Sequence, residues 1–118
     1  MEKFNFDWNY IDTCMPQITI SKTNIGCNKK AIDLLEKPQK VVIGFDEKNL
    51  AIGIKAYNGI DKVHTYDFAR RVTNGWVRMG CKGFIKYLSN YGLDFEKAKK
   101  FNAKYLSEEK ILYIELAK

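Results

Sequence analysis

The sequence predicts an α+β fold in which two β-α-β-β units pack about a pseudo-twofold axis as a single domain, preceded by an N-terminal extended strand. The chain has 118 residues, the length of one domain, and its 46% apolar and 29% charged residues are typical of a globular protein. The order strand, helix, strand, strand occurs twice, over residues 17–57 and 76–117. Residues 58–75 show no sustained period, so we interpret them as a connector within a domain that covers residues 1–118.

The extended strand is predicted over residues 4–10, before the first unit. Aromatic and polar residues alternate there, with Phe4, Phe6, Trp8 and Tyr10 on one side. This period is typical of a strand or arm that lays one face on the core. The alternative, an aromatic platform on which bases stack, would need flanking basic residues that this segment lacks. We therefore interpret the segment as structural.

The first unit begins with a strand that leads into a short helix. Ile18 and Ile20 alternate with polar residues, and Asn28 is of a type preferred at the N-cap of a helix. Pro38 ends the helix because proline cannot continue the hydrogen-bond ladder. The apolar stripe of this helix, at helical spacing, consists of Ala31, Ile32, Leu34 and Leu35.

The second unit repeats the strand and the helix. Residues 76–81 have the pattern of a strand, and Gly92 stands where a left-handed residue would end the helix that follows. Superposing residues 25–35 on residues 78–88 matches helix with helix, so we expect both helices to pack in one core. Residues 93–100 are predicted to be a polar turn or a short helix. The apolar face of the second helix consists of Phe84, Ile85, Leu88 and Tyr91.

Each unit ends in a predicted hairpin. In the first unit, residues 41–45 and 50–57 have strand composition and flank a polar turn. In the second unit, residues 101–106 and 110–116 also have strand composition and flank a polar turn. Two hairpins that each present one apolar face can bury those faces against each other.

The pattern of residues 20–57 resembles that of a known family. It consists of a strand, a turn into a short helix with a leucine near its end, and a two-stranded hairpin. This pattern resembles the AbrB/SpoVT-like swapped-hairpin family, in a tandem, MraZ-like arrangement, and the "ISK" strand also resembles small uncharacterised proteins of Firmicutes. The resemblance implies a DNA-binding, transcription-regulator-like protein that works as a dimer or pseudo-dimer of such units.

Basic residues are the candidates for contact with DNA. The net charge of +6 attracts phosphates, arginine can fork to guanine or phosphate, and lysine supplies a point charge. In the arrangement that the resemblance implies, basic residues near strand ends and helix starts share one face. The alternative is that these side chains are solvated, or that an arginine stem packs on Phe68. The candidates are Lys22, Lys29, Lys30, Arg70, Arg71, Arg78 and Lys82.

Catalytic and metal sites are not predicted. Cys14, Cys27 and Cys81 form no C-x-x-C pair and are odd in number, so we interpret them as reduced thiols rather than as disulfides or zinc ligands. His64 is the only histidine, and no nucleophile elbow or glycine-rich phosphate motif is present. The paired acids at residues 46–47 and 108–109 have the context of hairpin turns. We therefore expect no enzyme activity, no cofactor and no bound metal.

A second function remains open on the sequence alone. The chain could be a protein-interaction accessory module of a mobile element, which docks on a protein partner through its aromatic arm or a sheet edge. No apolar run approaches the roughly 18 residues of a membrane span, and the first ten residues do not have the pattern of a secretion signal, so we expect a cytoplasmic protein without membrane contact. The expected partners are duplex DNA or a protein. The expected assembly is a monomer, as a pseudo-dimer, or a homodimer.

Overall fold

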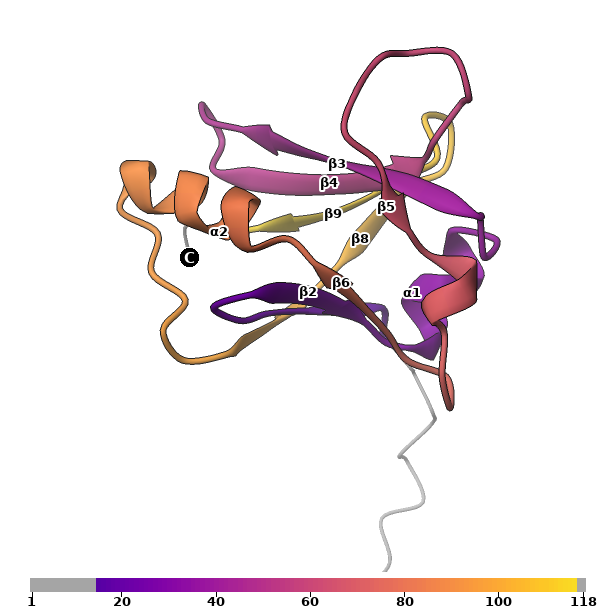
Figure 1. The fold of residues 1–118 in the computed structure, drawn as a ribbon, viewed down its shortest axis with the longest axis horizontal. Helices are drawn as coiled ribbons and strands as arrows, with labels where there is room; N and C mark the ends of the chain where they lie inside the picture. Colours follow the sequence, from indigo (N-terminus) through magenta and orange to yellow (C-terminus); the bar gives the residue numbers. More distant parts are fainter. Residues whose placement is uncertain (1–14, 117–118) are drawn as a thin grey trace, which may run out of the picture.

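Two antiparallel sheets enclose the core of residues 15–116, which are the residues that the computed structural model describes (Figure 1). The predicted strand at residues 4–10 lies outside the described residues. The four-stranded sheet has the order β6 (Val77–Gly80), β2 (Asn24–Cys27), β1 (Gln17–Ile20), β7 (Lys99–Asn102). The five-stranded sheet has the order β5 (Tyr66–Asp67), β3 (Lys40–Asp46), β4 (Ala51–Ala56), β9 (Ile111–Glu115), β8 (Lys104–Leu106).

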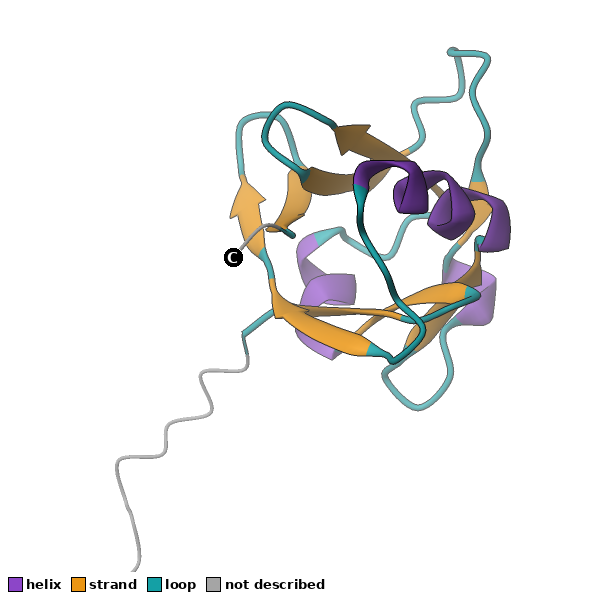
Figure 2. Ribbon diagram, turned by 90° about the vertical axis from the view of Figure 1, so that its left-hand side faces the viewer, coloured by secondary structure: helices purple, strands orange, loops and turns teal. Residues whose placement is uncertain are grey.

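Two short helices lie at opposite ends of the molecule (Figure 1). They are α1 (Lys29–Leu34) and α2 (Lys82–Leu88), and α2 continues as the 3-10 turn η2 (Ser89–Tyr91). Gly92 follows with a φ of +77°, so the predicted left-handed end of the second helix is confirmed. A second 3-10 turn, η1 (Ala69–Arg71), lies between β5 and β6 (Figure 2).

Both sheets and both helices contribute side chains to a single core. Ile18 and Ile25 enter it from the four-stranded sheet, and Ile52 and Leu112 enter it from the five-stranded sheet; all four are fully buried. The helices add most of the side chains that their apolar spacing predicts: Ala31, Ile32, Leu35, Ile85 and Leu88. Leu34, Phe84 and Tyr91, which belong to the same predicted faces, are only partly buried. The described residues thus form a compact α+β globule made mostly of strands, and the α+β class is confirmed.

Asn28 is the predicted N-cap of α1, and its side chain makes three hydrogen bonds. Its Oδ1 accepts from the backbone N–H of Ala31 at 3.0 Å, which caps the helix, and from the N–H of Gln17 at 3.0 Å. Its Nδ2 donates to the carbonyl oxygen of Met15 at 2.9 Å. The cap therefore also fixes the entrance of the chain into β1.

The segment before α1 differs from its prediction. One strand was expected between Ile18 and the helix, whereas the chain forms a hairpin of β1 and β2 with Ile20 opposite Ile25. The Ser21 N–H donates to the Asn24 carbonyl at 2.9 Å, and the Ser21 hydroxyl donates to the Asn24 side chain at 3.0 Å. These local bonds reverse the chain, because serine and asparagine side chains compete with a continuous ladder for backbone groups.

The last part of the chain also departs from its prediction. Residues 93–98 form no helix and agree with the predicted turn, but residues 99–100 already belong to β7. The predicted strand over residues 101–106 is divided into β7 and β8 at Ala103. Ala103 is buried, and its N–H donates to the carbonyl of Pro16 at 2.8 Å. The chain passes there from the four-stranded to the five-stranded sheet, so it links the two layers.

Candidate nucleic-acid interface

The outward side of the four-stranded sheet is polar. Directly opposed residues of an antiparallel pair point to the same side, so Ile18, Cys27 and Val77, which are in register, all face the core. The residues between them face outward, and none of them carries a carboxylate; Gly26 and the Thr19 hydroxyl in the middle of this side are themselves buried. We call these outward residues the polar sheet face: Gln17, Thr19, Asn24, Gly26, Arg78, Gly80, Lys100 and Asn102.

One row of this face runs across all of its strands. Arg78 lies opposite Gly26, Gly26 opposite Thr19, and Thr19 opposite Lys100. A Cβ placed on Gly26 would lie 3.7 Å from the Cγ of Arg78, so the arginine stem extends over the glycine. Three steps between strands of about 4.8 Å separate the backbones of Arg78 and Lys100 by about 14 Å. The two exposed cations are therefore far enough apart to reach different phosphates.

An open hollow of about 660 Å³ adjoins this face at β6. A tight turn shapes it: Asn74 and Gly75 have φ values of +52° and +76°, and Thr73 and Trp76 exchange backbone hydrogen bonds of 2.7 and 3.0 Å. Trp76 is 42% exposed, so its ring can stack on a ligand. We call this site the tryptophan hollow; it is lined by Arg71, Thr73, Asn74, Trp76 and Arg78.

Three of the predicted residues lie around the tryptophan hollow. Arg71 and Arg78 line it. Lys29 adjoins it, because its Cβ lies 3.7 Å from a Cβ placed on Gly75. Residues from α1, η1 and β6 thus converge although they are far apart in the sequence. Lys29 also forms an ion pair with Asp33 at 3.1 Å, and both side chains are more than half exposed, so the pair is weak.

Two other predicted residues lie at the opposite end of β2 and β6. Lys22 is in the β1–β2 turn and Lys82 begins α2. The two segments meet where the Cys81 N–H donates to the carbonyl of Thr23 at 3.0 Å. Lys22 also forms an exposed ion pair with Glu96 at 3.7 Å. These lysines extend the basic character of the polar sheet face, but they do not reach the hollow.

The remaining two predicted residues belong to neither group. Arg70 forms an ion pair with Asp67, with its Nη1 3.6 Å from the Oδ2 of the carboxylate. Lys30 is exposed on α1. Lys30 was predicted from its place near the start of the helix and Arg70 from its place on the connector, and neither residue lines the tryptophan hollow.

Sequence reasoning missed Lys100, Trp76 and the amide side chains of Gln17, Asn24 and Asn102. Lys100 fell in a segment predicted as a turn or short helix, where its position on a sheet face could not be seen. The alternation in "KKFN", residues 99–102, is the signal that would have placed it.

The cysteines and the histidine form no catalytic arrangement among residues 15–116. Cys27 and Cys81 are buried free thiols, as predicted, and Cys14 lies outside the described residues. His64 packs edge-on against Tyr66 at 4.7 Å and hydrogen-bonds to no thiol in the described part of the chain. Burial raises the pKa of Tyr66, with a smaller contribution from Cys81. Within the same residues, no group of three acidic, cysteine or histidine side chains is placed to hold a metal ion.

The paired acids are turn residues, as predicted. The Asp46 carboxylate accepts from the N–H of Lys48 at 3.0 Å, and from the backbone and side chain of Asn49 at 3.2 and 2.8 Å. The hydrogen bonds from Asn49 lower the pKa of Asp46, so this carboxyl is not suited to act as a general acid. In the second hairpin, Glu108 and Glu109 are exposed in the β8–β9 turn.

We expect the two described cysteines to resist alkylation at pH 8. Burial raises the pKa of Cys27 to about 12 and that of Cys81 to about 11, so the reactive thiolate is scarce. Labelling a Cys14→Ser variant with iodoacetamide, followed by peptide mass spectrometry, should show slow modification in buffer and rapid modification in urea. Equal rates in both would contradict the expectation.

The same pKa shifts predict the sign of a pH effect on stability. Because the folded-state pKa values lie above the ordinary value of 9.0, their contribution is fully present below about pH 9. Between about pH 9 and pH 11–12 the thiols lose their protons in the unfolded chain but keep them in the folded chain. The free energy of unfolding therefore falls as the pH rises through this range.

Comparison of the chain with protein-family models, with curated proteins and with solved structures found no match. The resemblance to the AbrB/SpoVT-like family therefore stays a prediction from the sequence pattern. Neither of the two described α-helices is long and apolar enough to cross a membrane.

Proposed function

We propose that this chain is a non-enzymatic, transcription-regulator-like protein that binds duplex DNA through the polar sheet face and the tryptophan hollow. The observation that carries the proposal is the composition of this surface: arginine and lysine, amide side chains and an exposed tryptophan, with no carboxylate among the outward residues of the sheet. Cations bind phosphates, and amides and arginines form hydrogen bonds with base edges. The lack of a catalytic arrangement in the described residues agrees with a binding role.

We further propose that the two β-α-β-β units are related by an approximate twofold axis, so that the monomer is a pseudo-dimer. Two strand pairs support this. β2 and β6 are the strands that precede the helix in each unit, and they pair antiparallel with each other, with Ile25 opposite Met79 and Cys27 opposite Val77. A twofold axis between the units would pair corresponding strands in this way.

The second strand pair, β4–β9, has the same property. β4 and β9 are the last strands of the two units, and they too pair antiparallel with each other, with Ile52 opposite Ile114 and Ile54 opposite Leu112. Both hairpins also end their turns on a residue with positive φ, Leu50 at +50° and Lys110 at +58°. These agreements support the tandem arrangement that the sequence resemblance implies.

The proposal predicts salt-dependent binding to DNA of mixed sequence. Each phosphate neutralised releases counterions and adds about −0.9 to the slope of log K against log salt, so contacts by Lys29, Arg71, Arg78 and Lys100 would give a slope of about −3 to −4. Fluorescence-anisotropy titrations of a labelled duplex at several salt concentrations measure this slope. An unlabelled competitor duplex controls for binding to the dye.

The alternative function is a protein-interaction module. It is favoured by an apolar groove along β3 that carries little of the basic surface. Absence of DNA binding at low salt would reject the DNA proposal and favour this alternative. A slope near zero with measurable affinity would also count against phosphate contacts.

A further inference from the structure

The β3 strand has a backbone edge that is open over most of its length. On one side it pairs with β4 from Val41 to Asp46. On the other side, the short strand β5 pairs only with Lys40 and Val41. Residues 42–46 therefore have no strand partner on that side among residues 15–116. Such an edge is a template for another strand, and proteins usually cover or block it.

The open edge presents two sets of backbone hydrogen-bonding groups. The N–H of Tyr57 donates to the carbonyl of Lys40 at 2.9 Å, so the backbone groups of Lys40 face β4. Backbone groups alternate in direction along an antiparallel strand. Those of Ile43 and Phe45 consequently face the open edge, with two N–H donors and two carbonyl acceptors available.

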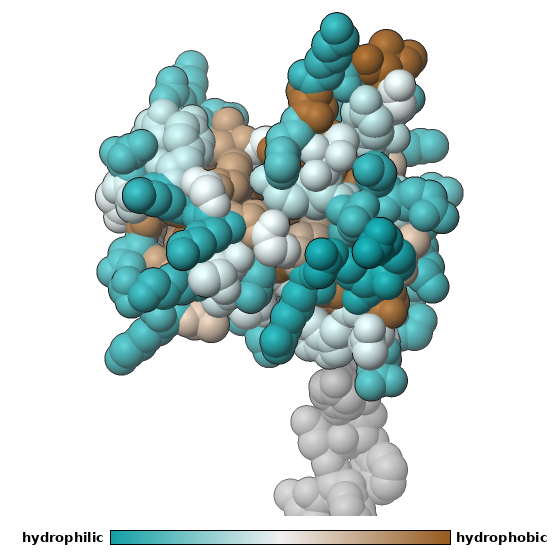
Figure 3. Space-filling view, viewed as in Figure 1, coloured by the Kyte–Doolittle hydropathy of each residue, from teal (hydrophilic) through white to brown (hydrophobic). Residues whose placement is uncertain are grey.

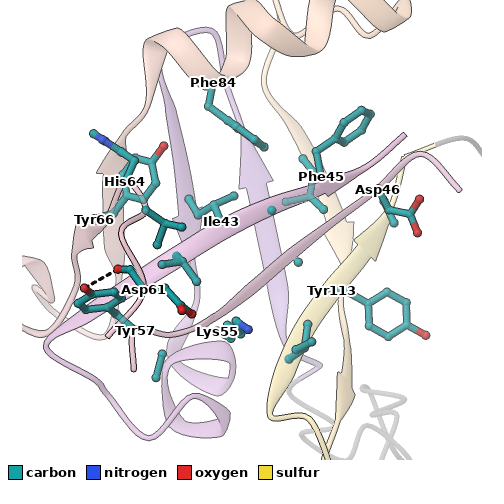
Figure 4. A pocket seen from close by; sticks show the side chains of 18 of the residues that line it. Ile43, Phe45, Asp46, Lys55, Tyr57, Asp61, His64, Tyr66, Phe84 and Tyr113 are labelled. Atoms are coloured by element: carbon teal, nitrogen blue, oxygen red, sulfur yellow. Dashed lines mark hydrogen bonds between the residues drawn. The ribbon is translucent and has the colours of Figure 1, made fainter. Parts of the chain in front are cut away.

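An open apolar groove of about 640 Å³ adjoins this edge and extends over the neighbouring strands β4 and β9. In Figure 4, Phe84 reaches from α2 toward β3, Tyr66 and His64 lie at one end of the groove, and Phe45 lies at the other. The side chains of Ile43, Phe45, Tyr66 and Phe84 are only partly buried, so they have apolar surface left to cover. We call this site the β3 groove.

The walls of the β3 groove are held in place by the rest of the fold. Phe45 contacts the rings of Tyr91 at 4.9 Å and Tyr87 at 5.9 Å, which joins the tip of β3 to α2. At the other end, the Tyr57 hydroxyl donates to the carbonyl of Asp61 at 2.7 Å and ties down the loop that follows β4.

The same loop adds exposed apolar surface beside the groove. Val63 lines the groove and is 53% exposed, and Ile60 is 81% exposed. Figure 3 shows brown, hydrophobic surface at the tip of this loop. A groove built in this way accepts an extended peptide with apolar side chains at alternate positions.

We propose that the β3 groove is occupied by the chain's own segment of residues 4–10, which adds a strand to the open edge of β3. This segment, "FNFDWNY", has an aromatic residue at every second position. In an added strand those side chains would all face one side of the sheet, toward Ile43 and Phe84, while the polar residues between them face water. The main chain of the segment would bind the free groups of Ile43 and Phe45.

The linker to the described chain is short. Residues 11–14 join the segment to Met15 and span about 13–14 Å when extended, so the reach of this linker decides whether the segment enters the groove of its own molecule or that of a second copy. Residues 1–14 contain three acids and one lysine, a charge of −2, whereas the rest of the chain has 19 basic and 11 acidic residues, a charge of +8. Opposite charges draw the segment toward the body of the protein as a whole, and the pairing pattern rather than charge selects the groove, whose lining includes Asp46, Lys55 and Asp61.

The test reads the environment of Trp8 in the full-length protein. A Trp76→Phe background leaves Trp8 as the only tryptophan. If the segment occupies the groove, Trp8 emission should be shifted to the blue and its quenching by acrylamide should be several-fold weaker than in urea. Repeating the measurement over a range of protein concentrations distinguishes docking within one chain, which is independent of concentration, from exchange between two copies.

Matched variants locate the docking site. Ile43→Lys places a charge on the side of β3 that the aromatic residues would cover, whereas Gly44→Glu adds a side chain on the opposite side, where a Cβ would meet no atom within 4 Å. Ile43→Lys should restore fast quenching of Trp8, and Gly44→Glu should leave the quenching slow. Gly80→Glu is a second control: its Cβ also meets no atom, but it lies on the other sheet.

Variants in the segment complete the test. Phe4→Ser with Phe6→Ser should expose Trp8, whereas Asn5→Ser with Asn9→Ser, on the polar side, should not. Circular dichroism confirms that each variant is folded. Fast quenching of Trp8 in the parent protein, or protection that Ile43→Lys leaves unchanged, would overturn the proposal. Neither result bears on DNA binding.

Discussion

Replacing Leu88 by alanine is expected to lower the free energy of unfolding by about 2–5 kcal/mol and to unfold both sheets in one transition. Leu88 is completely buried and belongs to the core to which both sheets and both helices contribute. Removing its side-chain methyl groups loses their transfer free energy and leaves a cavity that the close-packed interior closes only in part.

Urea unfolding followed by circular dichroism and by tryptophan fluorescence measures this effect. The two probes should report the same midpoint, because a shared core unfolds cooperatively. Leu106→Ala is the matched control, since Leu106 is 41% exposed on the edge strand β8 and its truncation should cost little. Separate transitions for the two probes would show that the halves do not depend on one core.

The sequence was sufficient to predict those elements that local chemistry determines. The helix spacing of Ile32, Leu35, Ile85 and Leu88 requires only that one side of each helix be buried, and all four are. Asn28 caps α1 because the capping bond spans three residues. Interactions of this range are visible in a linear pattern.

Elements that depend on distant partners were predicted less well. The division between β7 and β8 at Ala103 is set by a hydrogen bond to Pro16, which lies 87 residues earlier in the chain. Superposing residues 25–35 on residues 78–88 aligned the helices correctly, because Asn28 and Cys81 are both N-caps. It placed the strands before the helices one residue out of register. Ile25 faces the core whereas Arg78 faces outward.

The strand mismatch has a simple cause. In the first unit the core residue Cys27 is followed directly by the N-cap. In the second unit Gly80 lies between the core residue Met79 and the N-cap Cys81. One additional residue in a strand changes which face every preceding side chain occupies, so an alignment anchored on the helix misplaces the strand.

The candidate site could be predicted only in part for the same reason. Net charge pointed to a phosphate-binding surface, and Lys29, Arg71 and Arg78 do lie together. Which lysines share a face, however, depends on sheet register. Lys100 and Arg78 lie on the same face of one sheet, on strands that are separated by two others. No local sequence pattern shows this arrangement.

Reversing the charges of Arg78 and Lys100 should abolish most of the binding that we propose. Arg78→Glu with Lys100→Glu removes two phosphate contacts, so the salt slope should become less steep by about 2. Relative to 1 M salt, where this electrostatic contribution vanishes, the two contacts correspond to about a hundredfold weaker binding at about 50 mM salt. Both side chains are exposed, so the fold should be retained.

The control is a variant with the same net charge. Lys62→Glu with Lys86→Glu also lowers the net charge from +6 to +2, but these exposed lysines lie on the β4–β5 loop and on α2. If binding followed net charge alone, both double variants would weaken it equally, and the assignment of the polar sheet face would fail. Lys29→Glu with Lys30→Glu should have an intermediate effect, because only Lys29 adjoins the tryptophan hollow. Anisotropy titrations of all three variants on one duplex thus rank the surfaces. The proposal requires the largest loss of affinity for the sheet variant, a smaller loss for the α1 variant, and the smallest loss for the variant on the loop and α2.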